Sequence, residues 1–157
     1  MLQSKIALVT GGARGIGEAI ARVLCREGAK VVVSDLNQED CDKIVKSLTL
    51  PQDHLGLKID VSKRTSVTSG LENVVKKYAK APDIVVHAAG IIKPKTLLKM
   101  NDDTFDKVID INLKGTYLVN QVFATAMKNQ KIQGSIVNIS SIAGNINNLP
   151  FEVNNFL

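Results

Sequence analysis

The 157-residue chain is poor in aromatic side chains, with no tryptophan, two tyrosines and four phenylalanines. Proteins that bind nucleic acids commonly stack the bases on aromatic side chains. This scarcity therefore argues against a nucleic-acid partner, even though the formal net charge is +5. The lysines are scattered through helical segments, as at Lys76 and Lys77, where a solvated helix face accounts for them. We expect no nucleic-acid binding.

The chain also lacks the features of disulfide-rich, membrane-spanning and exported proteins. Its two cysteines, Cys25 and Cys41, both fall within helical patterns, and we expect reduced thiols. No apolar run is long enough to cross a membrane. The first predicted strand starts at Lys5, and we therefore expect no cleavable targeting segment. We also predict no metal site.

What the chain does have is a glycine-rich turn between an apolar strand at residues 6–9 and a helical pattern that starts at Glu18. The first N–H groups of such a helix, together with the positive end of its dipole, form an anion site. Gly11 allows the tight turn, Gly15 allows a pyrophosphate to approach the backbone, and Gly17 allows the helix to pack closely. The turn therefore predicts a site for the phosphates of a dinucleotide.

A second predicted strand ends in Asp35, eighteen residues beyond Gly17. That spacing is close to the one at which a carboxylate meets the ribose hydroxyls of adenosine. The same carboxylate would repel a 2′-phosphate and favours NAD, whereas Arg14 could pair with that phosphate and favours NADP. Repulsion between the 2′-phosphate and the nearby carboxylate costs more free energy than an ion pair with a flexible surface arginine gains. We therefore expect NAD rather than NADP.

Apolar strands alternate with helical segments along the chain. Strands are predicted at 5–10, 29–35, 54–59, 83–88 and 134–140, and helices at about 15–28, 38–48, 63–80 and 102–129. This alternation predicts an α/β fold of the Rossmann type, a doubly wound parallel sheet whose five strands have the order 3-2-1-4-5. Ligands bind at the carboxyl ends of such strands, where we expect Thr10, Asp35, Asp60, Ala88 and Ser140.

The helix predicted at 102–129 begins with Asp102 and Asp103, whose carboxylates suit the positive end of a helix dipole. Apolar residues follow along it at helical spacing. They are Phe105, Val108, Ile109, Leu113, Val119, Val122 and Phe123. We expect this stripe to pack in the core or in a subunit interface.

Five motifs, in this order, resemble the short-chain dehydrogenase/reductase family. The motifs are Thr-Gly-x-x-x-Gly-x-Gly at residues 10–17, Asp60-Val61, Ala88-Ala89-Gly90, Asn112-Leu113-Lys114-Gly115 and the run Ile139-Ser140-Ser141-Ile142-Ala143-Gly144. The asparagine that usually precedes the third motif is His87 here. The resemblance implies the following cofactor-binding residues: Thr10, Gly11, Arg14, Gly15, Ile16, Gly17, Asp35, Asp60, Val61, Ala88, Ala89 and Gly90.

In this family a tyrosine protonates the substrate carbonyl while nicotinamide delivers hydride, and a lysine four residues later lowers the pKa of the tyrosine. The resemblance implies that Ser141 hydrogen-bonds the carbonyl and that Asn112 holds a water leading to the lysine. The tyrosine is absent from its place, about thirteen residues after Ser141, where this chain has Asn154. Tyr78 and Tyr117 are the only tyrosines, and neither has a lysine four residues later.

We therefore divide the chain into an incomplete NAD(P)-binding domain at residues 1–144 and a divergent, asparagine-rich tail at residues 145–157. The resemblance implies an NAD-dependent dehydrogenase or reductase, and it implies that the sheet of this chain is truncated after strand 5. The missing Tyr-x-x-x-Lys predicts that this chain is catalytically incomplete. The alternative is a non-catalytic fragment that binds cofactor, or binds other subunits through the helix at 102–129.

Within the family, residues 106–116 and 134–142 are similar to the group of 17β-hydroxysteroid dehydrogenase type 8 and 3-oxoacyl-carrier-protein reductases. That similarity implies a small-molecule substrate, either a steroid 17β-hydroxyl or a 3-oxoacyl thioester. It also implies homo- or hetero-tetramers. The mitochondrial matrix is the implied location, with the cytoplasm as the alternative.

Overall fold

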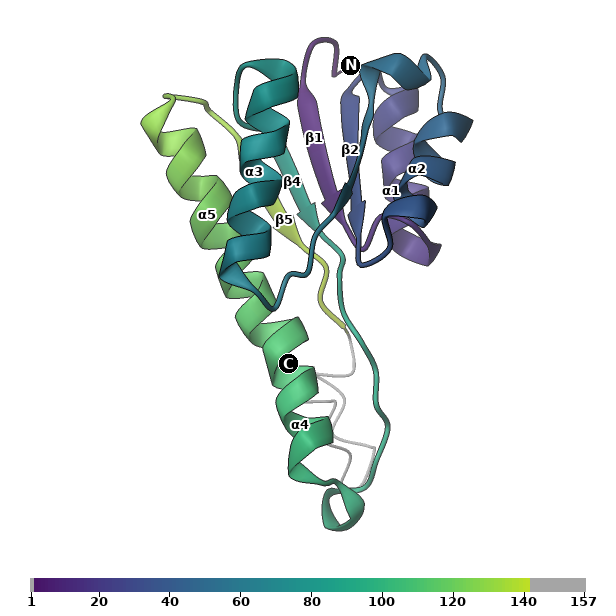
Figure 1. Cartoon of the computed structure of the whole chain (residues 1–157), viewed down its shortest axis with the longest axis vertical. Coiled ribbons are helices and arrows are strands. Elements are labelled where there is room, and N and C mark those ends of the chain that lie inside the picture. Colours follow the sequence, from purple (N-terminus) through teal and green to yellow (C-terminus); the bar gives the residue numbers. More distant parts are fainter. Residues whose placement is uncertain (1, 142–157) are drawn as a thin grey trace.

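The computed structural model describes residues 2–141, apart from the side chain of Leu97, and these residues form one parallel sheet flanked by helices (Figure 1). The strands are β1 (Ile6–Thr10), β2 (Lys30–Asp35), β3 (Leu55–Lys58), β4 (Ile84–His87) and β5 (Ser135–Asn138). All neighbouring pairs are parallel, and their order is β3-β2-β1-β4-β5. The expected Rossmann-type fold and strand order are confirmed.

Helices cover both faces of the sheet (Figure 1). The α-helices are α1 (Gly15–Arg26), α2 (Gln38–Ser47), α3 (Arg64–Tyr78), α4 (Asp102–Val108) and α5 (Gly115–Asn129). Short 3₁₀ turns are η1 (Pro51–Asp53) and η2 (Leu97–Lys99), and η3 (Ile109–Lys114) is a π-helix. The helices α1 and α2 lie on one face, and α3 and α5 lie on the other.

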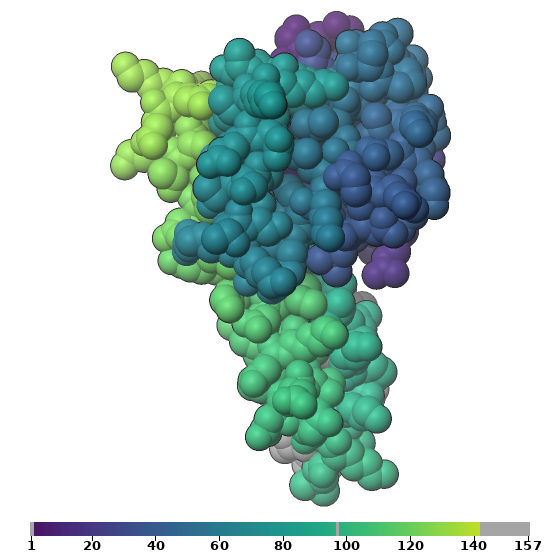
Figure 2. Space-filling view, viewed as in Figure 1, coloured from purple at the N-terminus to yellow at the C-terminus, as the bar shows by residue number. Residues whose placement is uncertain are grey.

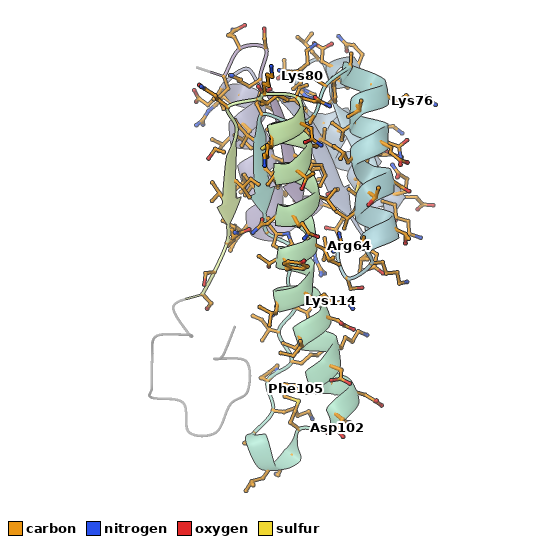
Figure 3. All side chains as sticks on the ribbon, turned by 90° about the vertical axis from the view of Figure 1, so that its left-hand side faces the viewer. Arg64, Lys76, Lys80, Asp102, Phe105 and Lys114 are labelled. Carbon is orange, nitrogen blue, oxygen red and sulfur yellow. The ribbon has the colours of Figure 1, made fainter. Side chains whose placement is uncertain are left out.

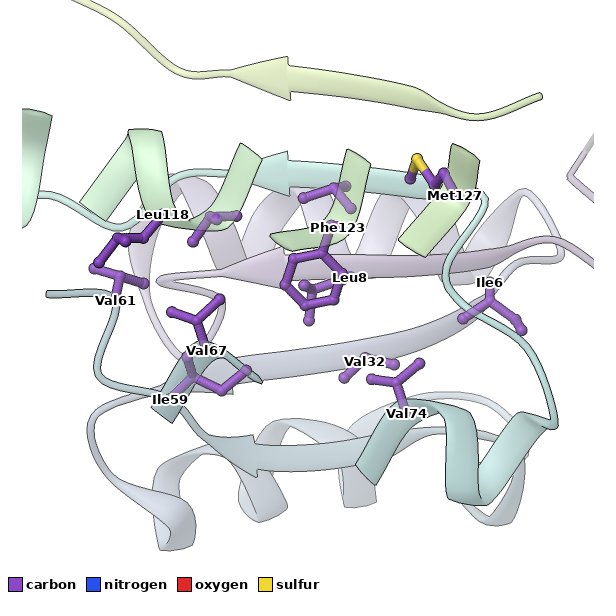
Figure 4. Packing of buried hydrophobic residues seen from close by; sticks show 12 residues of the cluster. Ile6, Leu8, Val32, Ile59, Val61, Val67, Val74, Leu118, Phe123 and Met127 are labelled. Atoms are coloured by element: carbon purple, nitrogen blue, oxygen red, sulfur yellow. The ribbon is translucent and has the colours of Figure 1, made fainter. Parts of the chain in front are cut away.

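Two apolar clusters hold these layers together, because successive side chains of a strand point to opposite faces of the sheet. Leu8, Val32 and Val85 pack against α3 and α5, with Phe123 at the centre of the contact (Figure 4). Alternate residues such as Val33 pack against α1 and α2. All five residues of β1 are buried, as expected for the central strand of a parallel sheet that is covered on both faces.

The two edge strands of the described sheet differ. On β3, the side chain of Gln38 accepts a hydrogen bond from the Lys58 N–H and donates one to the Gly56 carbonyl, which satisfies part of the open edge. On β5, Ile136 packs against the core, whereas Val137 lies on the opposite face and is 45% exposed. The β5 edge is therefore the more open of the two.

The helix expected at 102–129 is divided into α4, η3 and α5, and its apolar stripe is only partly buried. Val108, Val119 and Phe123 are buried, but Phe105 is 42% exposed and Leu113 is 54% exposed. The reason is that α4 and the loop before it project beyond the carboxyl edge of the sheet, where no strand among residues 2–141 lies beneath them (Figures 1 and 2). Of the two expectations for this stripe, core packing holds for Val108, Val119 and Phe123, and a subunit interface stays a prediction for Phe105 and Leu113.

Candidate functional site

The glycine turn joins β1 to α1 at the carboxyl edge of the sheet. Gly11 and Gly15 have φ angles of 63° and 54°, which side-chain-bearing residues rarely adopt. A Cβ atom at Gly17 would clash with the carbonyl oxygen of Gly11, so the start of α1 lies directly against the turn. A Cβ at Gly15 would meet no atom within 4 Å, which leaves space beside this backbone for a ligand.

A pocket of about 360 Å³ opens beside this turn, at the carboxyl ends of β2, β3 and β4. All of the expected cofactor residues except Thr10 line it. The described residues around the pocket are Gly11, Arg14, Gly15, Ile16, Gly17, Asp35, Leu36, Ile59, Asp60, Val61, Ala88, Ala89, Gly90, Ile91 and Ile111. The fold thus gathers residues from three of the five motifs, together with Asp35, around one cavity.

Asp35 ends β2 and faces the pocket beside the turn. One carboxylate oxygen accepts a hydrogen bond from the Ala13 N–H at 3.2 Å, and the other accepts one from the Leu36 N–H at 2.8 Å. These two bonds fix the orientation of the carboxylate. Because each oxygen has a second lone pair, the group can still accept hydrogen bonds from a ligand.

Asp60 follows β3 and is held more tightly by its own neighbours. One of its oxygens accepts hydrogen bonds from the Ser62 N–H and hydroxyl at 3.1 and 2.6 Å, and the other lies 3.2 Å from the Lys63 ammonium. Burial opposes ionisation, but the bonds from Ser62 and the charge of Lys63 lower the pKa of Asp60 below its ordinary value. Asp60 is therefore ionised at neutral pH.

Thr10 lies beneath the pocket and does not line it. Its hydroxyl accepts a hydrogen bond from the Ala89 N–H at 3.3 Å and shares another with Nδ1 of His87 at 2.8 Å. His87 is only 2% exposed, and burial lowers the pKa of its imidazole to about 4. Its Nε2 atom has no hydrogen-bond partner among residues 2–141. A neutral histidine thus lies beneath the pocket, and no local sequence pattern indicates its contact with Thr10.

Asn112 lies in the π-helix η3 and anchors the loop that leaves β4. Its side-chain oxygen accepts a hydrogen bond from the Ile91 N–H at 2.9 Å, and its side-chain nitrogen donates one to the Ile91 carbonyl at 3.0 Å. The amide is thus engaged with backbone on both sides. Ser141 is exposed, follows β5, and is not among the described residues that line the pocket.

The apolar residues in the walls of the pocket were not among the predicted cofactor-binding residues. Leu36 and Ile59 are direct chain neighbours of the predicted acids Asp35 and Asp60, so the position next to a strand-end acid was an available signal. Ile91 and Ile111 had no comparable signal. Apolar walls of this kind suit the flat faces of aromatic rings, and the glycine turn suits phosphates.

These features fit a dinucleotide that carries two heterocyclic rings and a pyrophosphate. The structure gives no sign of a competing metal centre within residues 2–141, where no three histidine, cysteine, aspartate or glutamate side chains are grouped to hold an ion. In the same residues, no helix combines the length and the apolar character needed to span a membrane.

Comparisons with known proteins agree with this site. The family described as short chain dehydrogenase matches residues 5–153. The (3R)-3-hydroxyacyl-CoA dehydrogenase of Homo sapiens is 40% identical over 94% of this chain and 60% of its own length. The 3-oxoacyl-[acyl-carrier-protein] reductase FabG of Thermotoga maritima is 38% identical over 91% of this chain and 58% of its own length.

A solved structure is similarly close. The apo form of LigD from Sphingobium sp. strain SYK-6 superposes with a TM-score of 0.86 at 30% identity, over 92% of this chain and 62% of that chain. The chain thus spans about 60% of the length of the curated relatives that it matches. The fold, the glycine turn and the pocket agree with this match. The chain belongs to the short-chain dehydrogenase family.

Proposed function

We propose that this chain forms the NAD-binding part of a dehydrogenase or reductase that acts on 3-hydroxyacyl or 3-oxoacyl thioesters. Proteins of this family bind nicotinamide cofactors through a Rossmann-type fold. The observation that carries the choice of NAD is the Asp35 carboxylate, which lines the pocket directly beside the glycine turn. A 2′-phosphate placed there would be repelled by a fixed negative charge.

Different residues of the chain suit different parts of the cofactor. The amide groups at the start of α1 suit the pyrophosphate, Asp35 suits the ribose hydroxyls, and the apolar walls suit the rings. A bound nicotinamide supplies hydride transfer, in which the hydroxyl-bearing carbon loses its hydrogen with the electron pair while the hydroxyl loses its proton. The residues at 88–91 line the pocket beyond the turn, where the nicotinamide end would bind.

The proton donor is the missing part. Tyr78 donates its hydroxyl to the Asp53 carbonyl at 2.9 Å, and Tyr117 is 55% exposed and accepts a hydrogen bond from Gln121. Neither tyrosine lines the pocket. Residues 2–141 can therefore bind the cofactor without supplying the tyrosine that the family uses for proton transfer.

The names of two relatives support a thioester substrate rather than a steroid. The human relative is named for a 3-hydroxyacyl-CoA, and the Thermotoga maritima relative is named for a 3-oxoacyl group on a carrier protein. A steroid 17β-hydroxyl is the weaker alternative, because it rests on the sequence similarity alone. We also propose that the protein is located in the mitochondrial matrix, with the cytoplasm as the alternative. Subcellular fractionation tests this location.

A second candidate is a non-catalytic fragment that binds the cofactor and associates with other subunits. The observation that favours it is the exposed stripe of Phe105, Leu113 and Tyr117 along α4, η3 and α5. Exposed apolar residues that repeat at helical spacing suit a helix-to-helix contact. We propose association through this stripe, as in the tetramers that the family resemblance implies.

Fluorescence titration with NADH, followed by an acetoacetyl-CoA reduction assay, separates these candidates. We expect NADH to bind more tightly than NADPH, and Asp35→Asn to reduce that preference by about tenfold through loss of the charge. Asp40→Asn, on the exposed surface of α2, serves as a matched control. Binding without turnover fits the non-catalytic fragment. Turnover would overturn the prediction of catalytic incompleteness, and an absence of binding would contradict both candidates.

A further inference from the structure

The loop between β4 and α4, residues 91–101, carries three lysines and no acidic residue. It begins at Ile91, which lines the cofactor pocket and is held by both sides of the Asn112 amide. Lys93 follows two residues later, so its backbone lies at most about 7 Å farther along the chain. The positive charge of this loop therefore starts at the mouth of the cofactor pocket.

Two lysines of this loop meet α4 around a hollow of about 500 Å³. The residues that line it are Lys93, Pro94, Lys95, Asp103, Thr104 and Lys107. Three ammonium groups thus face one carboxylate. Within residues 2–141, neither Lys95 nor Lys107 forms an ion pair with a carboxylate. Neither ammonium group is therefore neutralised by a direct ion pair.

A neighbouring hollow, which shares Asp103 and Lys107 with the first, has the reverse charge balance. It also contains Asp60, Asp106 and Asp110, so four carboxylates there stand against the single ammonium of Lys107. Of the two hollows, only the one beside the loop has more lysines than carboxylates, and two of its three lysines come from the loop. A cavity with several ammonium groups at its wall suits phosphate, which lysine binds as a point charge.

We infer that the hollow of Lys93, Lys95 and Lys107 binds the phosphate groups of the pantetheine handle that carries the acyl thioester. The inference rests on the proposed function, since the thioester must reach the nicotinamide end of the cofactor pocket. Its pantetheine arm separates the reacting carbon from the phosphates, and the loop runs from the one position to the other. Coenzyme A and the prosthetic group of an acyl carrier protein share this phosphate chemistry.

The test is calorimetric titration of the chain, saturated with NADH, by coenzyme A, 4′-phosphopantetheine and pantetheine. Saturation with NADH keeps the adenosine of coenzyme A out of the cofactor pocket. We expect coenzyme A and 4′-phosphopantetheine to bind and pantetheine, which has no phosphate, to bind at least tenfold more weakly. Tighter binding of coenzyme A points to the free thioester as substrate, and equal binding of the two points to the carrier-protein handle.

The variants Lys95→Gln and Lys107→Gln should each raise the dissociation constant of coenzyme A about tenfold and leave that of NADH unchanged. Lys76→Gln is the matched control, because Lys76 is exposed on α3 at the end of the molecule away from α4 (Figure 3). The inference is overturned if NADH binds but coenzyme A does not, if pantetheine binds equally well, or if the lysine variants behave like the control. Loss of NADH binding by the unmodified chain would instead contradict the proposed function.

Discussion

The polar groups at the two ends of the sheet differ in how far other groups of the chain satisfy them. At the amino end, the buried carboxylate of Asp83 accepts a hydrogen bond from the Ile6 N–H at 2.9 Å and pairs with Lys80 at 2.8 Å and Lys5 at 3.4 Å. Its own carbonyl accepts the Ser135 N–H, so it joins β1, β4 and β5. The carboxylate, the N–H and the carbonyl of Asp83 thus all have partners within residues 2–141.

The carboxyl end leaves some of its polar groups open to a ligand. The turn exposes the first amides of α1, and Asp35 retains acceptor capacity towards the pocket. One end of the sheet therefore stabilises the fold, and the other end leaves groups for a ligand. Substitutions at the amino end should change the free energy of unfolding, and substitutions that alter the pocket should change the affinity for the cofactor.

The largest expected effect on folding stability comes from pH, through His87, which is buried and does not line the pocket. Burial depresses the pKa of His87 to about 4, so the unfolded chain binds a proton more readily than the folded one. Folding stability should therefore be unaffected by His87 above about pH 6.5 and fall by about 3 kcal/mol between pH 6.5 and 4. Urea denaturation at several pH values measures this. His87→Asn should remove that part of the pH dependence, and an unchanged slope in the variant would contradict the assignment.

The variant Gly17→Ala should selectively weaken cofactor binding at the carboxyl end of the sheet. Its Cβ would clash with the Gly11 carbonyl oxygen and displace the turn. We expect the dissociation constant of NADH to rise about a hundredfold, since overpacking of this kind costs about 1–3 kcal/mol. Fluorescence titration provides the measurement, and Ala19→Ser on the exposed side of α1 is the control. Equal affinity in both variants would exclude the turn as the phosphate site.

The variant Asp83→Ala should destabilise the amino end of the sheet without affecting the pocket. Removal of the carboxylate leaves the buried Ile6 N–H unsatisfied, and we expect the free energy of unfolding to fall by about 2 kcal/mol. Although burial opposes ionisation, the bond from Lys80 lowers the pKa of Asp83, so this stabilisation is present above about pH 4 and is lost as the pH falls through the lowered pKa.

Denaturation of Asp83→Ala at pH 7, beside the exposed partner variant Lys5→Ala, tests this. Lys5→Ala should cost less than about 1 kcal/mol, as is usual for an ion pair with a partly exposed partner. In both variants the affinity for NADH should match that of the unmodified chain. A cofactor affinity that falls with Asp83→Ala would show that the two ends are not separate.

The smallest expected effect is local. Asn112→Ala removes both hydrogen bonds to the Ile91 backbone and should lower the protection of residues 88–93 against hydrogen exchange, with about 1 kcal/mol lost in local stability. Asn73→Ala, which removes one exposed bond to the Ser69 carbonyl, provides the comparison. If the two variants exchange alike in this loop, Asn112 does not anchor it.

Much of the fold could be predicted from the sequence because its signals are local. The alternation of apolar strands with helices determines the parallel sheet and its order, and the glycine turn determines the edge at which a ligand binds. The same reasoning placed Asp35 and Asp60 at that edge. Burial of Phe105 and Leu113 could not be judged in this way, because helical spacing does not show that α4 extends past the sheet.

Contacts between residues far apart in the chain were also beyond the sequence. Thr10 and His87 are 77 residues apart, and Asn112 and Ile91 are 21 apart, so no local pattern connects either pair. The roles of Ser141 and Asn112 in catalysis, and the boundary at residue 144, stay predictions; the tail at 145–157 lies outside the described residues.

Hydrogen exchange with and without NADH, followed at both ends of the sheet, tests the central claim most directly. We predict that NADH protects the amides of residues 11–17 and 88–91 and leaves residues 5–6 and 80–83 unchanged, because the cofactor binds only at the carboxyl end. Protection at the amino end alone, or no protection at residues 11–17 under saturating NADH, would contradict the claim.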